Sequence, residues 1–189
     1  MPIAGKAAHT VSLKLIQEFG SLAAVLAAPL SRRNRTLHSE PETARHLEHI
    51  RKATLHAMRD EALLGPKIAG TEQLARYLRA EMGWYANEQL RVLFLATELR
   101  LIADDVMTHG TVDSATLLPR PIIHRALDLA AAGIILIHNH PGGSPEPSQA
   151  DIEATYSLAK ACWPMEIQLL DHLIVARNGW VSFRVRGLL

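Results

Sequence analysis

Apolar and polar residues follow two different spacings along the chain. Apolar residues three or four positions apart predict helices over about 12–19, 21–28, 41–64, 121–132 and 148–161. Thr71 is predicted to cap a further short helix that carries Leu74, Tyr77 and Leu78. Short apolar runs predict strands over 90–96, 101–107, 134–140, 168–176 and 180–185, the last two joined across Asn178-Gly179. Residues 31–40 are polar and basic and are predicted to be a connection. Strands interleaved with helices indicate a mixed α/β domain.

Glycine and proline at Gly65-Pro66 end the long helix, because proline cannot continue a helical ladder. We therefore predict two parts: a small all-helical region over 1–66 and an α/β domain over 67–189. The total length of 189 residues is enough for one ordinary domain and a small helical appendage.

Charge and cysteine content limit the partners and the cellular compartment that we expect for this protein. Residues 1–80 carry 12 Lys/Arg against 7 Asp/Glu, and residues 81–189 carry 8 against 12, so +5 and −4 make the net charge of +1. We interpret the basic half as solvated helix surface rather than as a nucleic-acid interface. The single cysteine, Cys162, excludes an intrachain disulfide and is expected to be a buried thiol in a reducing compartment. The apolar runs over 22–30 and 129–137 are too short to span a bilayer, so we expect a cytoplasmic protein.

In the stretch ILIHNHPGGSPEPSQADIE, residues 135–153, the end of a predicted strand carries two histidines and is followed by a loop and an acidic helix start. His138 and His140 are two apart on a strand, so both rings project from one face, and Pro141 ends the strand. Each buried imidazole has one donor and one acceptor nitrogen that need partners. A divalent metal would take the lone pair of each ring, and neighbouring groups would accept its N–H. Asp151 is the candidate third ligand. With Ser148 it also fits a Ser-x-x-acid capping box, so a plain strand, turn and helix cap is the alternative interpretation.

Three protein ligands leave a fourth tetrahedral position open, as in catalytic zinc sites. A TIM-barrel hydrolase would need roughly 250 residues, and a zinc deaminase needs a Cys-x-x-Cys pair that one cysteine cannot provide.

The pattern His138-x-His140-Pro141-x(6)-Ser148-x-x-Asp151 resembles the JAMM motif of MPN/JAB metalloproteases, and the chain from about 71 to 189 is similar to RadC-like JAB proteins. Shared stretches include THGTVDSATLLPRPIIHRAL, LLDHLIV and GWVSFRVRG. This resemblance implies a JAB/MPN fold, which is cytidine-deaminase-like, with Zn²⁺ held by the two histidines and Asp151. It also implies zinc-dependent hydrolysis of a peptide or isopeptide amide in a protein substrate, with Ser148 stabilising the oxyanion.

The resemblance further implies a general base. Residues alone leave four glutamates open, namely Glu88, Glu98, Glu146 and Glu153, and similarity to RadC-like proteins selects Glu88. Asp171 and His172, in LLDHLIV, could either support the metal ligands or form a structural pair, and we interpret them as structural.

The N-terminal region departs from the RadC-like pattern. LIQEFGSLAAVLAAP matches the start of a helix-hairpin-helix, but no glycine lies between Gly20 and Gly65, so the Gly-x-Gly hairpin that contacts DNA phosphates is absent. We do not expect DNA binding through this degenerate hairpin. A DNA repair-associated accessory protein and a non-catalytic MPN interaction module remain the alternatives.

Overall fold

A computed structural model describes residues 5–65, 70–109 and 119–189. The chain divides into two compact units, Met1–Met58 and Arg59–Leu189, which are treated separately below. The division lies inside the long helix α4, Pro41–Leu63. The boundary predicted from sequence, after residue 66, lies outside the described residues.

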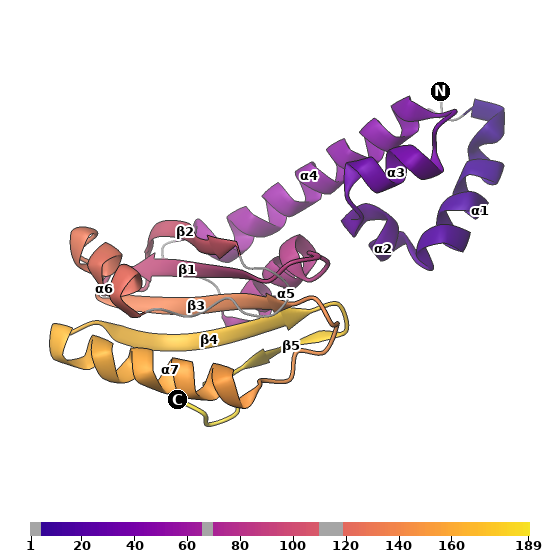
Figure 1. Ribbon diagram of the computed structural model, residues 1–189. Coiled ribbons are helices and arrows are strands. Elements are labelled where there is room, and N and C mark those ends of the chain that lie inside the picture. The colour runs from indigo at the N-terminus through magenta and orange to yellow at the C-terminus, as the bar shows by residue number, and fades with distance from the viewer. Residues whose placement is uncertain (1–4, 66–69, 110–118) are drawn as a thin grey trace. The chain divides into compact units, whose positions relative to one another are not determined.

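The first unit is built from short helices that end where the sequence contains turn residues. It comprises η1 (Gly5–Ala7), α1 (Ala8–Phe19), α2 (Leu22–Ala27), α3 (Leu30–Thr36) and most of α4 (Figure 1). Gly20 ends α1 in the left-handed conformation, at φ 82°, and its N–H donates to the Ile16 carbonyl. Ser21 caps α2 by accepting a hydrogen bond from the Ala24 N–H at 3.2 Å. Val11, Leu15 and Val25 belong to the small core of this unit.

Helix α3 corrects the prediction of a polar connection over 31–40. The Arg33 side chain is fully buried and donates to the carbonyls of Val25 and Leu26, at 3.3 and 3.1 Å, while pairing with Glu48. A charged side chain therefore supplies the interior contact of this helix, and a search for apolar periodicity does not detect it.

The second unit contains one mixed sheet with strand order β2-β1-β3-β4-β5 (Figure 1). Only β3 and β4 are parallel; the other pairs are antiparallel. In chain order the elements are α5 (Thr71–Met82), β1 (Gln89–Leu95), β2 (Leu101–His109), α6 (Pro119–Asp128), β3 (Gly133–His140), α7 (Gln149–Cys162), η2 (Trp163–Met165), β4 (Gln168–Ala176) and β5 (Gly179–Ser182). The predicted mixed α/β class, with a helical region before it, is confirmed.

Several boundaries differ from the predictions; for example, α1 begins at Ala8 and β2 continues to His109. Helix α5 begins at Thr71 with Gly70 at the capping position, so Thr71 is not the cap. Helix α6 ends at Asp128 rather than at the predicted residue 132. Two residues after this end, Ala130 has a positive φ of 48°, which is not helical. Strand β5 stops at Ser182, and a turn replaces the remaining predicted residues.

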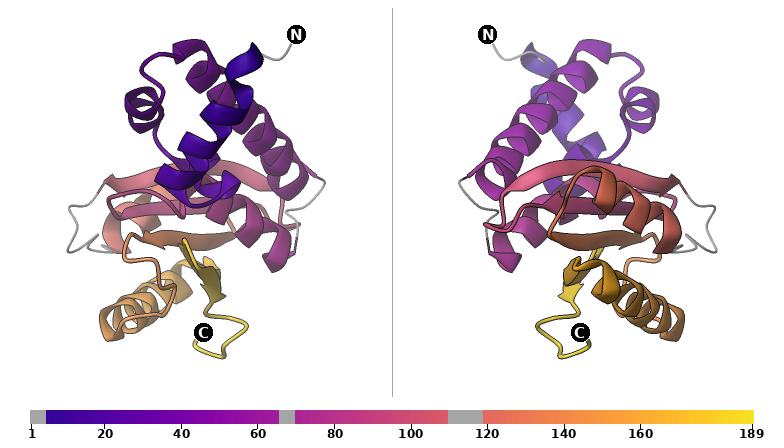
Figure 2. Two further views of the ribbon diagram at one scale, coloured as in Figure 1. Left: turned by 90° about the vertical axis from the view of Figure 1, so that its right-hand side faces the viewer. Right: turned by 90° about the vertical axis from the view of Figure 1, so that its left-hand side faces the viewer.

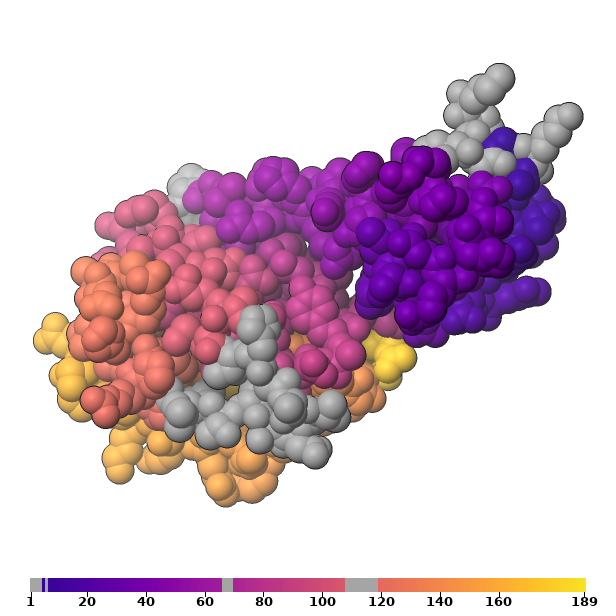
Figure 3. Space-filling model, turned by 45° about the horizontal axis from the view of Figure 1, so that its top comes forward, coloured from indigo at the N-terminus to yellow at the C-terminus, as the bar shows by residue number. Residues whose placement is uncertain are grey.

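Helices cover both faces of the sheet. On one face, α6 and α7 pack on β1 and β3 through a core that includes Ile122, Leu136 and Leu158. On the other face, α5 packs against β4 and β5 (Figure 2). The outer side of α6 lies at the molecular surface (Figure 3), where His124 pairs with Asp128. None of the helices in the described part of the chain combines the length and apolar character that crossing a membrane requires.

Candidate metal centre

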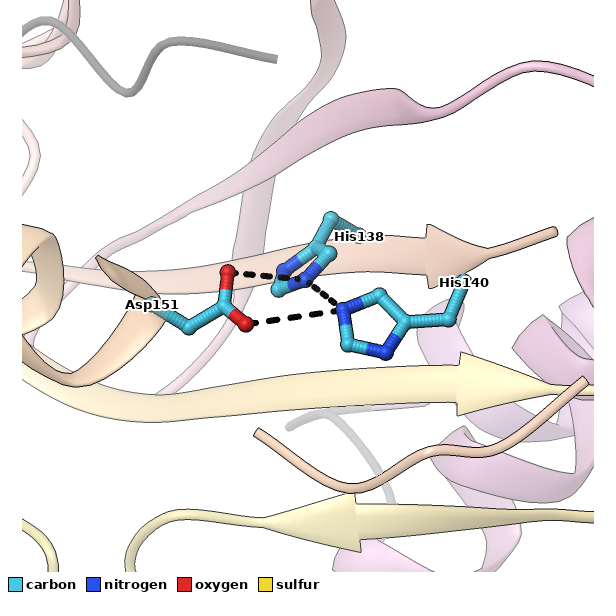
Figure 4. A group of neighbouring side chains, drawn as sticks. All are labelled: His138, His140 and Asp151. Carbon is cyan, nitrogen blue, oxygen red and sulfur yellow. Dashed lines mark hydrogen bonds and ion pairs between the residues drawn. The ribbon is translucent and has the colours of Figure 1, made fainter. Parts of the chain in front are cut away.

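The two histidines lie at the end of β3, in the middle of the sheet. Leu136, His138 and His140 point to the face covered by α6 and α7, since alternate residues of a strand share a face. His138 is buried, with 5% of its surface exposed, whereas His140 is half-buried. Both rings lie near the end of β3 and face the Asp151 side chain (Figure 4).

Asp151 reaches the histidines from the first turn of α7. The predicted capping box forms: the Ser148 Oγ accepts from the Asp151 N–H at 3.1 Å, and the Ser148 N–H donates to Asp151 Oδ2 at 2.7 Å. The Ser148 hydroxyl also donates to Oδ2, at 2.6 Å. The cap thus holds the carboxylate at the helix start and aims it towards the two rings.

The ligand atoms of the three side chains converge: they all lie within 4.8 Å of one another, and the two imidazole nitrogens are closer together than tetrahedral zinc would hold them. His138 Nε2 and His140 Nε2 are 2.8 Å apart, and Asp151 oxygens lie 3.3 and 3.5 Å from these two nitrogens (Figure 4). Four ligands at zinc distances of about 2.0–2.1 Å are separated from one another by roughly 3.3 Å. Two imidazoles with one carboxylate suit zinc and related transition metals better than Mg²⁺ or Ca²⁺, which prefer oxygen. These residues are also the cluster of potential metal ligands found among the described residues.

The outer ring nitrogens face other partners. His140 Nδ1 lies 3.0 Å from the Ser144 carbonyl, to which it donates. His138 Nδ1 lies 2.7 Å from Nε2 of His172 on β4, and His172 Nδ1 lies 2.6 Å from the hydroxyl of Thr155 on α7. Sequence reasoning singled out His172 as structural and missed Thr155, which looks like an ordinary helix-interior residue.

Electrostatics favour a neutral His138 and an ionised Asp151, the states that a metal needs, but favour protonation of His140. Burial lowers the pKa of His138 to about 4, against the opposing effect of Asp151. Burial also acts to lower the pKa of His140, but its hydrogen bond with Asp151 and the charge of that carboxylate raise the pKa above its ordinary value. Burial alone would raise the pKa of Asp151, yet hydrogen bonds from His140 and Ser148 hold it well below the usual range. At neutral pH His138 is therefore neutral and Asp151 ionised.

The structure separates the four candidate glutamates. Glu88 directly precedes β1, in which Leu90 pairs with His138. The charge of Glu88 also contributes to the raised pKa of His140. Glu98 is exposed in the turn between β1 and β2, at the other end of the strand. Glu146 pairs with Arg186 and Glu153 with Gln149, both at the surface.

Two further residues have defined environments. Asp171 is buried and accepts hydrogen bonds from the backbone N–H groups of His172 and Arg184 and from the Ser182 hydroxyl. Cys162 is buried in the apolar core, and burial raises the pKa of its thiol to about 11. Its thiol is therefore protonated at neutral pH and is not an activated nucleophile.

Comparison with known proteins agrees with this architecture. The family model described as "RadC-like JAB domain" matches residues 68–188. A UPF0758 protein from Rhodobacter capsulatus is 38% identical over 176 residues, which cover 93% of this chain and 82% of that protein. The family match spans the sheet, α7 and the three clustered side chains. The chain belongs to the RadC-like JAB domain family.

Proposed function

We propose that this protein is a zinc-dependent metallopeptidase or isopeptidase of the JAMM type, which hydrolyses a peptide or isopeptide amide in a protein substrate. The convergence of His138 Nε2, His140 Nε2 and the Asp151 carboxylate, with ligand atoms within 4.8 Å of one another, carries the proposal. Three protein ligands leave room for water or substrate in a fourth position, which distinguishes catalytic from structural zinc sites.

Bound zinc would polarise the scissile carbonyl and lower the pKa of a water ligand towards about 7. Glu88 is assigned the proton transfers: its carboxylate takes a proton from the attacking water and delivers it to the leaving amine. The position of Glu88 directly before β1, next to the strand that pairs with β3, and the effect of its charge on His140 support this role.

Ser148 is assigned to the oxyanion that forms during attack. Its hydroxyl already donates to Asp151 Oδ2, so it lies beside the carboxylate ligand and would redirect this hydrogen towards the substrate oxygen. Because the same hydroxyl also caps α7, a change at Ser148 acts both on the oxyanion and on the position of Asp151.

Metal content is the first test. Purified protein should contain close to one zinc per chain by elemental analysis, and a His138→Ala/His140→Ala variant should contain none while remaining folded. We expect folding to survive because the ligands lie at the edge of a well-packed core, unlike those of a zinc finger. Equal zinc in both proteins would refute the metal site.

Hydrolysis is the second test, on quenched fluorescent peptide libraries, isopeptide-linked conjugates and proteins that accumulate with a Glu88→Gln variant. Glutamine keeps the size of the side chain but cannot accept the proton, so turnover should fall by roughly 10²–10⁴. Zinc content should not change. Glu98→Gln is the matched control, because Glu98 is exposed in a turn at the far end of β1. Wild-type turnover by Glu88→Gln would refute the assignment of the base.

A further inference from the structure

We propose that His172, itself oriented by Thr155, is a positioning residue that holds the proton of His138 on Nδ1 and so presents His138 Nε2 to the metal. His172 comes from β4 and Thr155 from α7, so neither belongs to the motif that contains the ligands. The inference rests on the metal site of the proposed function, but not on its hydrolytic chemistry.

Donor and acceptor rules give the chain of hydrogen bonds a single direction. The Thr155 hydroxyl lies 2.5 Å from the backbone carbonyl of Asp151, which can only accept, so the hydroxyl hydrogen is used there. Thr155 Oγ1 must then accept from His172 Nδ1–H, at 2.6 Å. A neutral imidazole has one N–H, so His172 Nε2 accepts from His138 Nδ1–H, at 2.7 Å. His138 Nε2 is left with a lone pair that faces His140 and Asp151.

This chain of hydrogen bonds also connects metal ligands that come from different secondary-structure elements. It starts at the backbone of Asp151 on α7, crosses to β4, and ends at His138 on β3. Both linking side chains are buried, with 0% of Thr155 and 1% of His172 exposed. The His172 ring stacks on Phe183, with centroids 4.5 Å apart, and this contact restricts its rotation. The orientation of His138 is therefore fixed from inside the fold, whereas His140 and Asp151 are held by Ser144 and Ser148 of the exposed loop.

A direct ligand role for His172 does not fit the same contacts. Its two ring nitrogens are both within hydrogen-bond distance of other side chains, and its Nε2 meets the outer nitrogen of His138 rather than the inner one. The ligand cluster among the described residues consists of His138, His140 and Asp151. His172 acts on the metal through His138.

The experiment measures two quantities on the full-length chain: the histidine tautomers of metal-free protein, by ¹⁵N NMR at neutral pH, and zinc affinity, by chelator competition. In wild type, His138 should carry its proton on Nδ1. His172→Phe keeps an aromatic ring against Phe183 but has no acceptor, so His138 should populate the Nε2–H form. Zinc affinity should fall by roughly 10–100-fold, as for other groups that orient a metal-binding histidine.

Conservative variants separate orientation from packing. His172→Gln offers an amide oxygen to His138 and should restore the tautomer and most of the affinity. Thr155→Val removes the hydroxyl at nearly constant volume and should shift the same tautomer, whereas Thr155→Ser should not. His124→Gln, on the exposed side of α6, is the matched histidine control and should change neither measurement.

Three results would overturn the inference: a wild-type His138 protonated on Nε2, a His172→Phe variant that keeps both tautomer and affinity, or an affinity loss without any tautomer change. If His172→Phe does not fold, the tautomer of His138 in Thr155→Val tests the inference instead, because this variant keeps the rings of both His138 and His172. The predicted tautomer and affinity changes without amide hydrolysis would refute the proposed function alone and support the positioning role.

Discussion

Acidification should release zinc from this site in two separate proton-coupled steps. The two histidine ligands have pKa values on opposite sides of the ordinary value: burial lowers that of His138 to about 4, whereas Asp151 raises that of His140 above it. Metal binding requires both rings to be unprotonated at Nε2, so each proton competes with zinc in its own pH range. The Asp151 carboxylate stays ionised throughout, because its pKa lies well below the usual range.

The magnitude follows from counting protons. Below the pKa of His140, zinc must displace one proton, and the apparent affinity should fall by about tenfold per pH unit. From pH 6 to pH 5, a range below the ordinary histidine pKa of about 6.5 that His140 exceeds, the loss is then about tenfold. A second proton contributes only near pH 4, where the slope should steepen to about 100-fold per unit as His138 begins to titrate.

Competition with a chelator of known proton affinity, at fixed ionic strength, measures this profile. His124→Gln again serves as the control, since an exposed histidine away from the site should leave the slope unchanged. A slope of two protons already between pH 6 and pH 5 would show that both rings titrate together. An affinity independent of pH in that range would show that His140 carries no competing proton. Either result would refute the assigned electrostatics.

Three further predictions concern other parts of the chain. Asp171→Ala should lower the free energy of unfolding by roughly 3–5 kcal/mol in urea titration, because three hydrogen-bond donors lose their buried acceptor; Asp171→Asn should lose less, and a change below about 1 kcal/mol would contradict the structural role. Cys162 should resist alkylation in the native state and react only after denaturation, since burial raises the pKa of its thiol; fast native labelling would contradict this. The full chain should show negligible duplex DNA affinity by fluorescence anisotropy at physiological salt, because Arg32, Arg33 and Arg45 pair with glutamates; tight binding would overturn this expectation.

The sheet and its helices could be predicted because their signals are local. Strand β4 has the predicted bounds, and its connection to β5 falls at the predicted turn, since apolar runs bounded by Asn and Gly are read without tertiary information. Helix α3 was missed for the opposite reason. Its central contact is made by Arg33, whose burial depends on the carbonyls at the end of α2 and on Glu48 of α4. Nothing in the polar run itself indicates that these partners are available.

The same distinction applies to the site. The spacing of His138 and His140 and the capping box of Ser148 and Asp151 are short-range patterns, and the structure brings these side chains together as the sequence suggests. Thr155 and His172 depend on how α7 returns the chain to β4 and on the parallel register that pairs His172 with Leu136. That register is a long-range property, so a single sequence does not display the hydrogen-bond chain it creates.

The pair Asp171-His172 shows how one dipeptide can serve two faces of a sheet. Adjacent residues of a strand point to opposite sides, so the carboxylate holds Ser182 and Arg184 of the C-terminal segment while the imidazole orients His138. Buried polar groups are tolerated when each has a partner, and this sequence of contacts satisfies them one after another. This hydrogen-bond network ends at His138 Nε2, which lies 2.8 Å from His140 Nε2. The other ring nitrogen of His140, Nδ1, donates to the Ser144 carbonyl. Two lone pairs that face each other at this distance repel unless a proton or a cation lies between them. The buried network therefore leads, by donor and acceptor rules alone, to a position that binds either a proton or a metal ion.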